Sequence, residues 1–129
     1  MRKPTDFTRL MTSYLGSYLP LQRNVSKNTI SSYCDTFRLL LTFLRDEKSM
    51  SIERLRIQDF SPSLIREYLS WLGRDRHCGI STRNQRLAAL RAFFKYVEVE
   101  SPEHMLLCQK IINIKYTKKG QAYVFYLTT

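Results

Sequence analysis

Apolar residues recur at helical spacing in five segments of this chain, and turn signals separate the segments. The first segment runs roughly from Thr5 to Leu19, and Pro20 is expected to limit its continuation. The second runs from about Ser26 to Asp46, with Ser26 as its N-cap. The apolar faces of these predicted helices consist of Leu10, Met11, Tyr14 and Tyr18 in the first and Ile30, Tyr33, Phe37, Leu40, Leu41 and Leu44 in the second.

Three further helices are predicted. The third opens with Ser61-Pro62, a cap followed by proline at the first helical position, and stops before Gly79. The fourth covers residues 81–97, with Ser81 as its cap. The fifth starts with Ser101-Pro102-Glu103, again a cap followed by proline. Their apolar positions are Ile65, Tyr68, Leu69 and Leu72 in the third, Leu87, Leu90, Phe94 and Val97 in the fourth, and Met105, Leu106, Ile111 and Ile112 in the fifth.

The whole pattern predicts an all-α fold. The chain has only four glycines and four prolines, and no alternating apolar pattern appears before residue 121. One short helical turn is expected around Ser51–Arg54. Helices with short connections predict one compact bundle of four to five helices. Gln121–Thr129 is apolar and aromatic, and we interpret it as an extended connection to a further domain, with a tail packed on the bundle as the alternative.

The net charge of the chain narrows the range of possible functions. Lys and Arg number 21 against 11 Asp and Glu, which gives a formal net charge of +10. This excess slightly opposes folding through self-repulsion, so we interpret it as an adaptation to a polyanion. No apolar stretch is long enough to span a membrane, and no signal peptide is recognisable, so we expect a cytoplasmic protein without a membrane partner. Cys34, Cys78 and Cys108 are odd in number and far apart, which disfavours a disulfide framework.

The sequence lacks the constellations of a metal site or an enzyme. His77-Cys78 are adjacent, and His104 and Cys108 are four residues apart, but paired zinc-ligand spacings are absent. Neither a nucleophile elbow nor a phosphate-binding glycine loop is present. We therefore expect no metal, no cofactor, no small-molecule substrate and no catalytic residue.

Two predicted helix starts have the same polar character. Hydroxyls, amides and cations stand there beside backbone N–H groups that have no helical acceptor, and all of these groups suit phosphate oxygens. Asparagine and arginine side chains also read base edges. Capping alone explains Ser26 and Ser81 equally well, and a solvated basic face explains Arg91 equally well. The candidate residues are Ser26, Lys27, Asn28 and Thr29 in the second helix and Ser81, Thr82, Arg83, Asn84, Arg86 and Arg91 in the fourth.

Three passages resemble one protein family. Ser26–Tyr33 is similar to the S-x-N-T-x-x-x-Y opening of the second helix in the N-terminal core-binding (SAM-like) domain of tyrosine recombinases, which include phage integrases. Thr82–Tyr96 resembles that domain's T-x-N-x-x-L-x-x-L-R-x-F-F-x-Y helix. Tyr126-Leu127-Thr128 resembles the Y-L-T at which the catalytic domain begins. The resemblance covers about residues 5–129.

The resemblance implies double-stranded DNA as the partner, for DNA recombination and integration. In the family, two domains clamp the duplex, and the second and fourth helices of the helical domain cross at the major groove. Residues 1–114 would then form the DNA-binding core-binding domain, and residues 115–129 a basic interdomain linker. Linker cations that would follow the DNA backbone are Lys115, Lys118 and Lys119.

The resemblance also implies what this chain would not do by itself. The catalytic residues of the family lie in the C-terminal domain, so the chain would bind DNA without cutting it, and Tyr126 would be a linker residue. Other recombinase protomers would meet this domain through its first and fifth helices. The alternative from the residues alone is a helical interaction module for an acidic protein partner, and a self-contained enzyme is the weakest interpretation.

Overall fold

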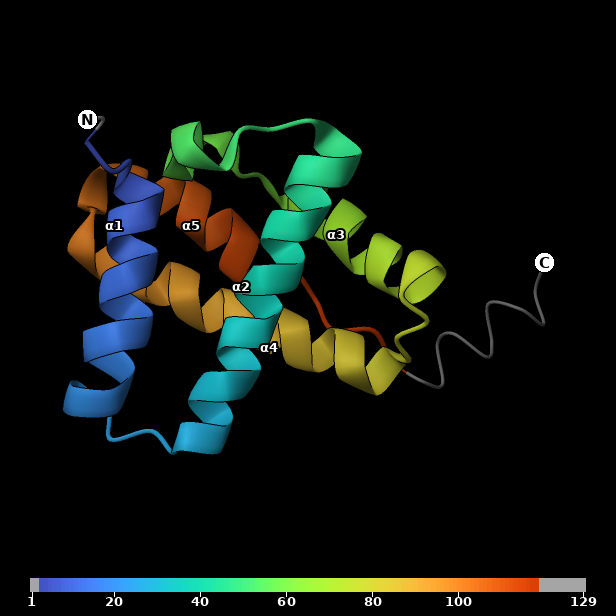
Figure 1. Ribbon diagram of the computed structural model, residues 1–129, viewed down its shortest axis with the longest axis horizontal. Coiled ribbons are helices and arrows are strands. Elements are labelled where there is room, and N and C mark those ends of the chain that lie inside the picture. The colour runs from blue at the N-terminus through green and yellow to red at the C-terminus, as the bar shows by residue number, and fades with distance from the viewer. Residues whose placement is uncertain (1–2, 119–129) are drawn as a thin grey trace.

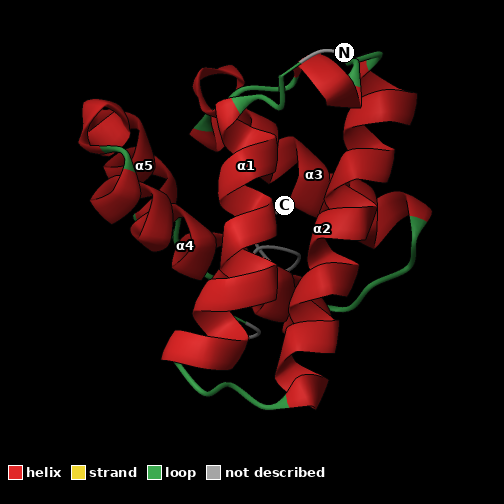
Figure 2. Ribbon diagram, turned by 60° about the vertical axis from the view of Figure 1, so that its left-hand side comes forward, coloured by secondary structure: helices red, strands yellow, loops and turns green. Residues whose placement is uncertain are grey.

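The computed structural model describes residues 3–118, which form helices, short helical turns and connections (Figure 1). Lys119 and the segment Gln121–Thr129, which the sequence predicts to be an extended connection and which contains the Y-L-T motif, lie outside the described residues. Residues 3–118 contain no strand, which confirms the predicted all-α fold (Figure 2). The elements are α1 (Asp6–Ser13), the π-helix η1 (Tyr14–Gln22), α2 (Lys27–Lys48), the 3₁₀ turns η2 (Ile52–Arg54) and η3 (Ile57–Asp59), α3 (Pro62–Asp75), α4 (Ile80–Glu100), the 3₁₀ turn η4 (Pro102–His104) and α5 (Met105–Ile112).

An aromatic core joins α4 to the N-terminal elements, and Phe93 lies at its centre with no exposed surface. Its ring lies edge-on to Phe7 of α1 and to Phe37 of α2, at centroid distances of 5.9 and 5.0 Å. Tyr14 of η1 is the third such neighbour, at 5.4 Å. Edge-to-face contacts of this kind add stability beyond the area that they bury. In Figure 1, α2 crosses in front of α4. Through Phe93, the long helix α4 therefore packs against both α1 and α2.

Two N-caps were correctly predicted. Ser26 Oγ accepts a hydrogen bond from the Thr29 N–H at 3.2 Å, and Ser61 Oγ accepts one from the Leu64 N–H at 3.1 Å. The turn expected around Ser51–Arg54 is present as η2, whereas η3 was not predicted. A cap is recognisable from sequence because its donor lies only three residues away.

Pro20 does not end the first helix, contrary to the prediction. The chain passes from α1 directly into the π-helix Tyr14–Gln22, which contains Pro20. Hydrogen bonds in this wider turn reach one residue further back, as in the bond from the Arg23 N–H to the Tyr18 carbonyl at 3.0 Å. This change of register accommodates a residue that lacks an N–H and whose ring crowds a regular α-helix.

The start of α4 also differs from the prediction. Gly79 occupies the N-cap position without any side-chain cap hydrogen bond, so Ser81 lies inside the first turn rather than at the cap. The Cys78 N–H donates to the Leu72 carbonyl at 2.9 Å, which closes the end of α3. That bond leaves Gly79 as the extended residue before α4, and glycine is well tolerated there.

The fifth helix begins later than predicted, and its apolar residues divide between core and solvent. Ser101 is followed by the 3₁₀ turn η4 and makes no cap bond, and α5 itself begins at Met105. Ile111 is fully buried, whereas Met105 and Leu106 are 42% and 75% exposed. The exposed pair leaves an apolar patch at the start of α5.

Candidate nucleic-acid interface

Exposed polar side chains surround the start of α2. The Ser26 hydroxyl donates to Thr29 Oγ1 at 3.0 Å in addition to capping the helix. The backbone N–H groups of Lys27 and Asn28 lie in the first turn, where a helix offers no acceptor. No acidic side chain lies in that turn. The start of α2 therefore presents free donors, an amide and an ammonium group to an anion.

The start of α4 has the same character. Its first turn contains no acidic residue and no side-chain cap, so the hydroxyls of Ser81 and Thr82 are not used as caps. The first intrahelical bond runs from the Arg83 N–H to the Gly79 carbonyl at 3.0 Å. The N–H groups that precede it have no helical acceptor. Two half-buried arginines, Arg83 and Arg86, follow within the next turn.

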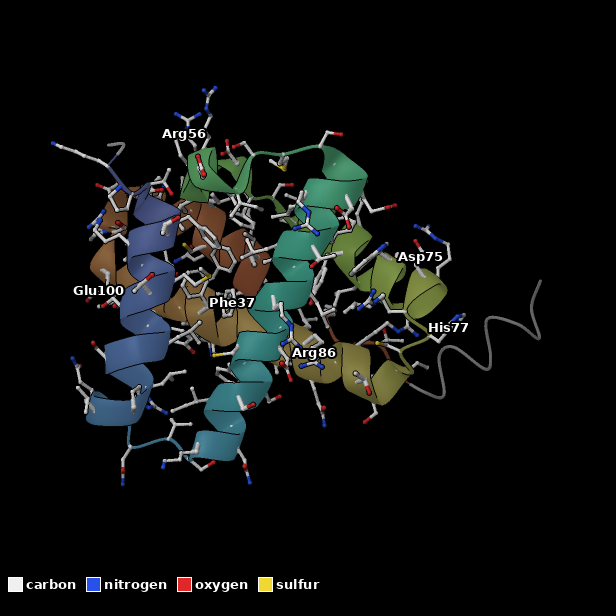
Figure 3. The ribbon with its side chains drawn as sticks, viewed as in Figure 1. Phe37, Arg56, Asp75, His77, Arg86 and Glu100 are labelled. Carbon is white, nitrogen blue, oxygen red and sulfur yellow. The ribbon has the colours of Figure 1, made fainter. Side chains whose placement is uncertain are left out.

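Arg86 joins the two helices near their crossing (Figure 3). Its Nη1 donates to the Ser32 carbonyl at 3.1 Å and to Thr36 Oγ1 at 3.3 Å. The carbonyl of buried Thr36 also accepts a hydrogen bond from the Tyr68 hydroxyl at 3.0 Å, which ties α3 to the same turn of α2. Burial raises the pKa of Tyr68, so this hydroxyl stays a neutral donor. Arg86 thus positions α4 on α2, and its DNA contact stays a prediction.

The side chain of Arg83 packs against α3 at Gly73, which has no side chain to occupy that space. A Cβ atom added to Gly73 would come within 3.2 Å of Arg83 Nη1 and 3.3 Å of its Nε. The Nε atom of Arg83 is buried, and it has no hydrogen-bond partner among the described residues. Packing therefore fixes this guanidinium group while one of its donors stays unused.

Asn84 holds the segment that follows α5. Its Nδ2 donates to the Thr117 carbonyl at 2.8 Å, and the Thr117 N–H donates to Asn84 Oδ1 at 3.0 Å. Further along α4, the Arg91 guanidinium lies 4.7 Å from the centroid of the Tyr116 ring. Two predicted DNA contacts, Asn84 and Arg91, are thus engaged with this chain's own C-terminal segment. Their contact with DNA stays a prediction.

We expect Asn84→Ala to accelerate trypsin cleavage after Lys115 and Lys118 by about fivefold or more. The substitution removes two hydrogen bonds, each worth about 0.5–1.5 kcal/mol, and so raises the population in which the segment is detached from α4. Mass spectrometry of native digests measures the rates. Gln85→Ala, at an exposed neighbouring position, is the control. Equal rates for the two variants would show that the Asn84 bonds do not hold the segment.

Beyond α5, Lys115 and Lys118 are exposed, and Lys119 lies outside the described residues. Lys115 lines one cavity together with Arg83 and with Arg66 of α3. Arg66 could not be recognised from the sequence, because a lone cation on the polar face of a helix looks like an ordinary solvated residue. Only its place in the fold connects it with the other two.

No acidic residue lies in the first turn of α2 or of α4. Within residues 3–118, none of the ion pairs involves Lys27, Arg83 or Arg86, so no acidic neighbour neutralises these cations. The cations that do pair with carboxylates in this part of the chain are Arg38, Arg45, Lys48, Arg56 and Arg74. These cations therefore add their charge to the positive ends of the two helices.

Other candidate chemistry is sparse in the part of the chain that the structure describes. No helix there is long and apolar enough to cross a membrane. No group of three or more His, Cys, Asp and Glu side chains within residues 3–118 could hold a metal ion. Cys34, Cys78 and Cys108 are free thiols. Burial, with a smaller contribution from Glu98, raises the pKa of Cys108 to about 11, which makes it a poor nucleophile at neutral pH.

Comparison with known proteins gives one consistent result. Residues 13–101 match the family described as the phage integrase, N-terminal SAM-like domain. A Sinorhizobium fredii protein named as an integrase/recombinase, y4rC, is 34% identical over 128 residues, which is 99% of this chain and 39% of that protein. A second one from that organism, y4rD, is 33% identical over 105 residues, 81% of this chain and 37% of that protein.

A more distant relative is the tyrosine recombinase XerC of Leptospira interrogans. It is 28% identical over 79 residues, which is 61% of this chain and 24% of XerC. The chain thus spans less than two fifths of the length of each of these three relatives. No solved structure matches it significantly.

Proposed function

Because this chain belongs to the phage integrase N-terminal SAM-like domain family of tyrosine recombinases, we propose that it binds duplex DNA for recombination and integration. One observation carries the proposal. Both α2 and α4 start with polar side chains and cations that make no ion pair with a carboxylate among the described residues. Arg86 fixes α4 on α2 through Ser32 and Thr36, so both starts belong to one rigid unit. Free backbone donors, hydroxyls and cations at both starts suit the phosphate backbone.

The proposed contacts fall into two groups. Residues at the helix starts would bind phosphates and, through amide and guanidinium groups, base edges in the major groove. Cations after α5 would follow the DNA backbone. The first group consists of Ser26, Lys27, Asn28, Thr29, Ser81, Thr82, Arg83, Asn84, Arg86 and Arg91, and the second of Lys115, Lys118 and Lys119.

The domain division follows from the same proposal. Residues 1–114 would be the core-binding domain and residues 115–129 the linker to a catalytic domain that cuts the DNA. The greater length of the relatives supports this division. The protein would act in the cytoplasm, where its DNA partner is accessible.

Contact with other recombinase protomers is part of the proposal. The exposed apolar side chains at the start of α5, Met105 and Leu106, are the ones that could bury area against a second copy. The isoleucines of the same segment, Ile111 and Ile114, are only 0% and 6% exposed. They pack in the core instead, so the contact would rest on the first turn of α5.

An acidic protein partner is the competing function, and a competition experiment separates the two. Fluorescence anisotropy with a labelled duplex of about 30 base pairs measures DNA binding, and poly-glutamate of equal total charge is added as competitor. We expect unlabelled duplex to compete at least tenfold better, because a DNA duplex carries one charge per about 1.7 Å in a geometry that fits helix-start donors. Equal or better competition by poly-glutamate would favour the protein-interaction function.

A further inference from the structure

A cavity of about 510 Å³ lies between α3, α4 and the residues that follow α5. These elements meet there because the bond between Cys78 and Leu72 turns the chain from α3 into α4, and because Asn84 holds Thr117 against α4. The polar residues that line the cavity are Arg66, Ser70, Arg83, Asn113, Lys115 and Thr117.

The lining combines three cations with no carboxylate. Within residues 3–118, none of the ion pairs involves Arg66, Arg83 or Lys115. Glu67, the acidic neighbour of Arg66 in sequence, pairs with Lys48 at 3.0 Å. Bringing like charges together without a counter-charge opposes folding, and a bound anion would offset that repulsion.

Arg83 adds an independent observation. Its guanidinium group packs against Gly73, where any larger residue would crowd it. Its buried Nε lacks a hydrogen-bond partner among the described residues. A buried donor without an acceptor is uncommon, because it has given up its bonds to water and gained none in return. Because Nε itself is closed to solvent, an anion in the cavity would contact other atoms of the Arg83 side chain, which packing holds at the cavity wall.

We propose that this cavity holds one phosphate group of the DNA backbone, contacted by Arg66, Arg83 and Lys115. The inference rests on the proposed function and adds α3, through Arg66, to an interface otherwise built from α2, α4 and the residues that follow α5. A phosphate group offers several charged oxygens, and guanidinium groups bind it through paired N–H donors. The cavity adjoins the first turns of α4, so a phosphate held there would lie beside those already assigned to the helix start.

The test compares Arg66→Gln with Arg54→Gln, because both remove one exposed arginine but only the first changes the cavity. We measure the slope of log K against log salt for duplex binding by the full chain. Loss of one phosphate contact should reduce the magnitude of the slope by about 0.9 and weaken binding roughly threefold to tenfold at low salt. Arg54→Gln should match wild type. Equal thermal unfolding of the two variants would confirm that both fold.

A second measurement follows the Nε–H resonance of Arg83 by NMR during titration with duplex DNA and, separately, with inorganic phosphate. We expect both titrations to shift the signal in wild type. In Arg66→Gln we expect each titration to produce a smaller shift than in wild type. A shift with inorganic phosphate but not with DNA would overturn the assignment to the DNA backbone. Wild-type DNA binding with an unaltered slope in Arg66→Gln would overturn the inference alone, whereas no wild-type DNA binding would overturn the proposed function and this inference with it.

Discussion

Phe93→Ala is expected to destabilise the fold by about 3–5 kcal/mol, the range for removing a fully buried phenylalanine from a packed core. Phe93 has no exposed surface, and its ring contacts aromatic rings from α1, η1 and α2. Truncation therefore opens a cavity at the point where three elements meet α4. The loss is a large part of the stability of a domain of this size, so partial unfolding at room temperature is expected.

Urea denaturation followed by circular dichroism measures this effect. Val99→Ala is the matched control, because Val99 lies on the same helix and is 74% exposed. We expect a change of less than about 0.5 kcal/mol for the control. Similar midpoints for Phe93→Ala and Val99→Ala would contradict the packing described here.

Neutralising one cation at each helix start, as Lys27→Gln with Arg83→Gln, is expected to weaken binding to duplex DNA about 30-fold to 100-fold at low salt. Each cation would contribute about 1–1.5 kcal/mol through a charge-assisted contact with phosphate, and tenfold in affinity corresponds to about 1.4 kcal/mol. Neither side chain pairs with a carboxylate among the described residues, and thermal unfolding of the double variant checks that losing the packing of Arg83 on Gly73 leaves the chain folded.

The control for charge alone is the double variant Arg9→Gln with Arg54→Gln. Both of these arginines are exposed, on α1 and η2, and their removal lowers the net charge by the same amount. We expect the control to lose no more than about threefold in affinity, through the weaker long-range field alone. If the control loses as much affinity as the helix-start variant, binding follows the net charge rather than the helix starts.

The sequence predicted features whose causes are local. Ser26 and Ser61 were recognisable as caps because each bonds to an N–H three residues further along the chain. The all-α fold follows from apolar spacing that repeats with the helical period. Pro20 misled the prediction, because proline usually ends an α-helix and the change to a π-helix leaves no sequence signal.

The features that the sequence could not predict depend on residues far apart in the chain. Asn84 and Thr117 are 33 residues apart, and no periodic pattern connects a helical amide with a later backbone segment. Arg86 and Thr36 are 50 residues apart. Arg66 looked like an ordinary surface cation until α3 and α4 were placed side by side. Sequence reasoning therefore proposed the helix starts, but not how α3 and the C-terminal segment are held beside them.

We propose that the starts of α2 and α4 form one phosphate-binding face, and the salt dependence of DNA binding decides whether they do. For the wild-type chain we predict a log–log slope near −4 to −5, which corresponds to roughly four to six neutralised phosphates. In the Lys27→Gln, Arg83→Gln double variant the magnitude should fall by about 1.8, since each lost phosphate contact removes about 0.9. A wild-type slope near zero, or an unchanged slope in the double variant, would contradict the claim.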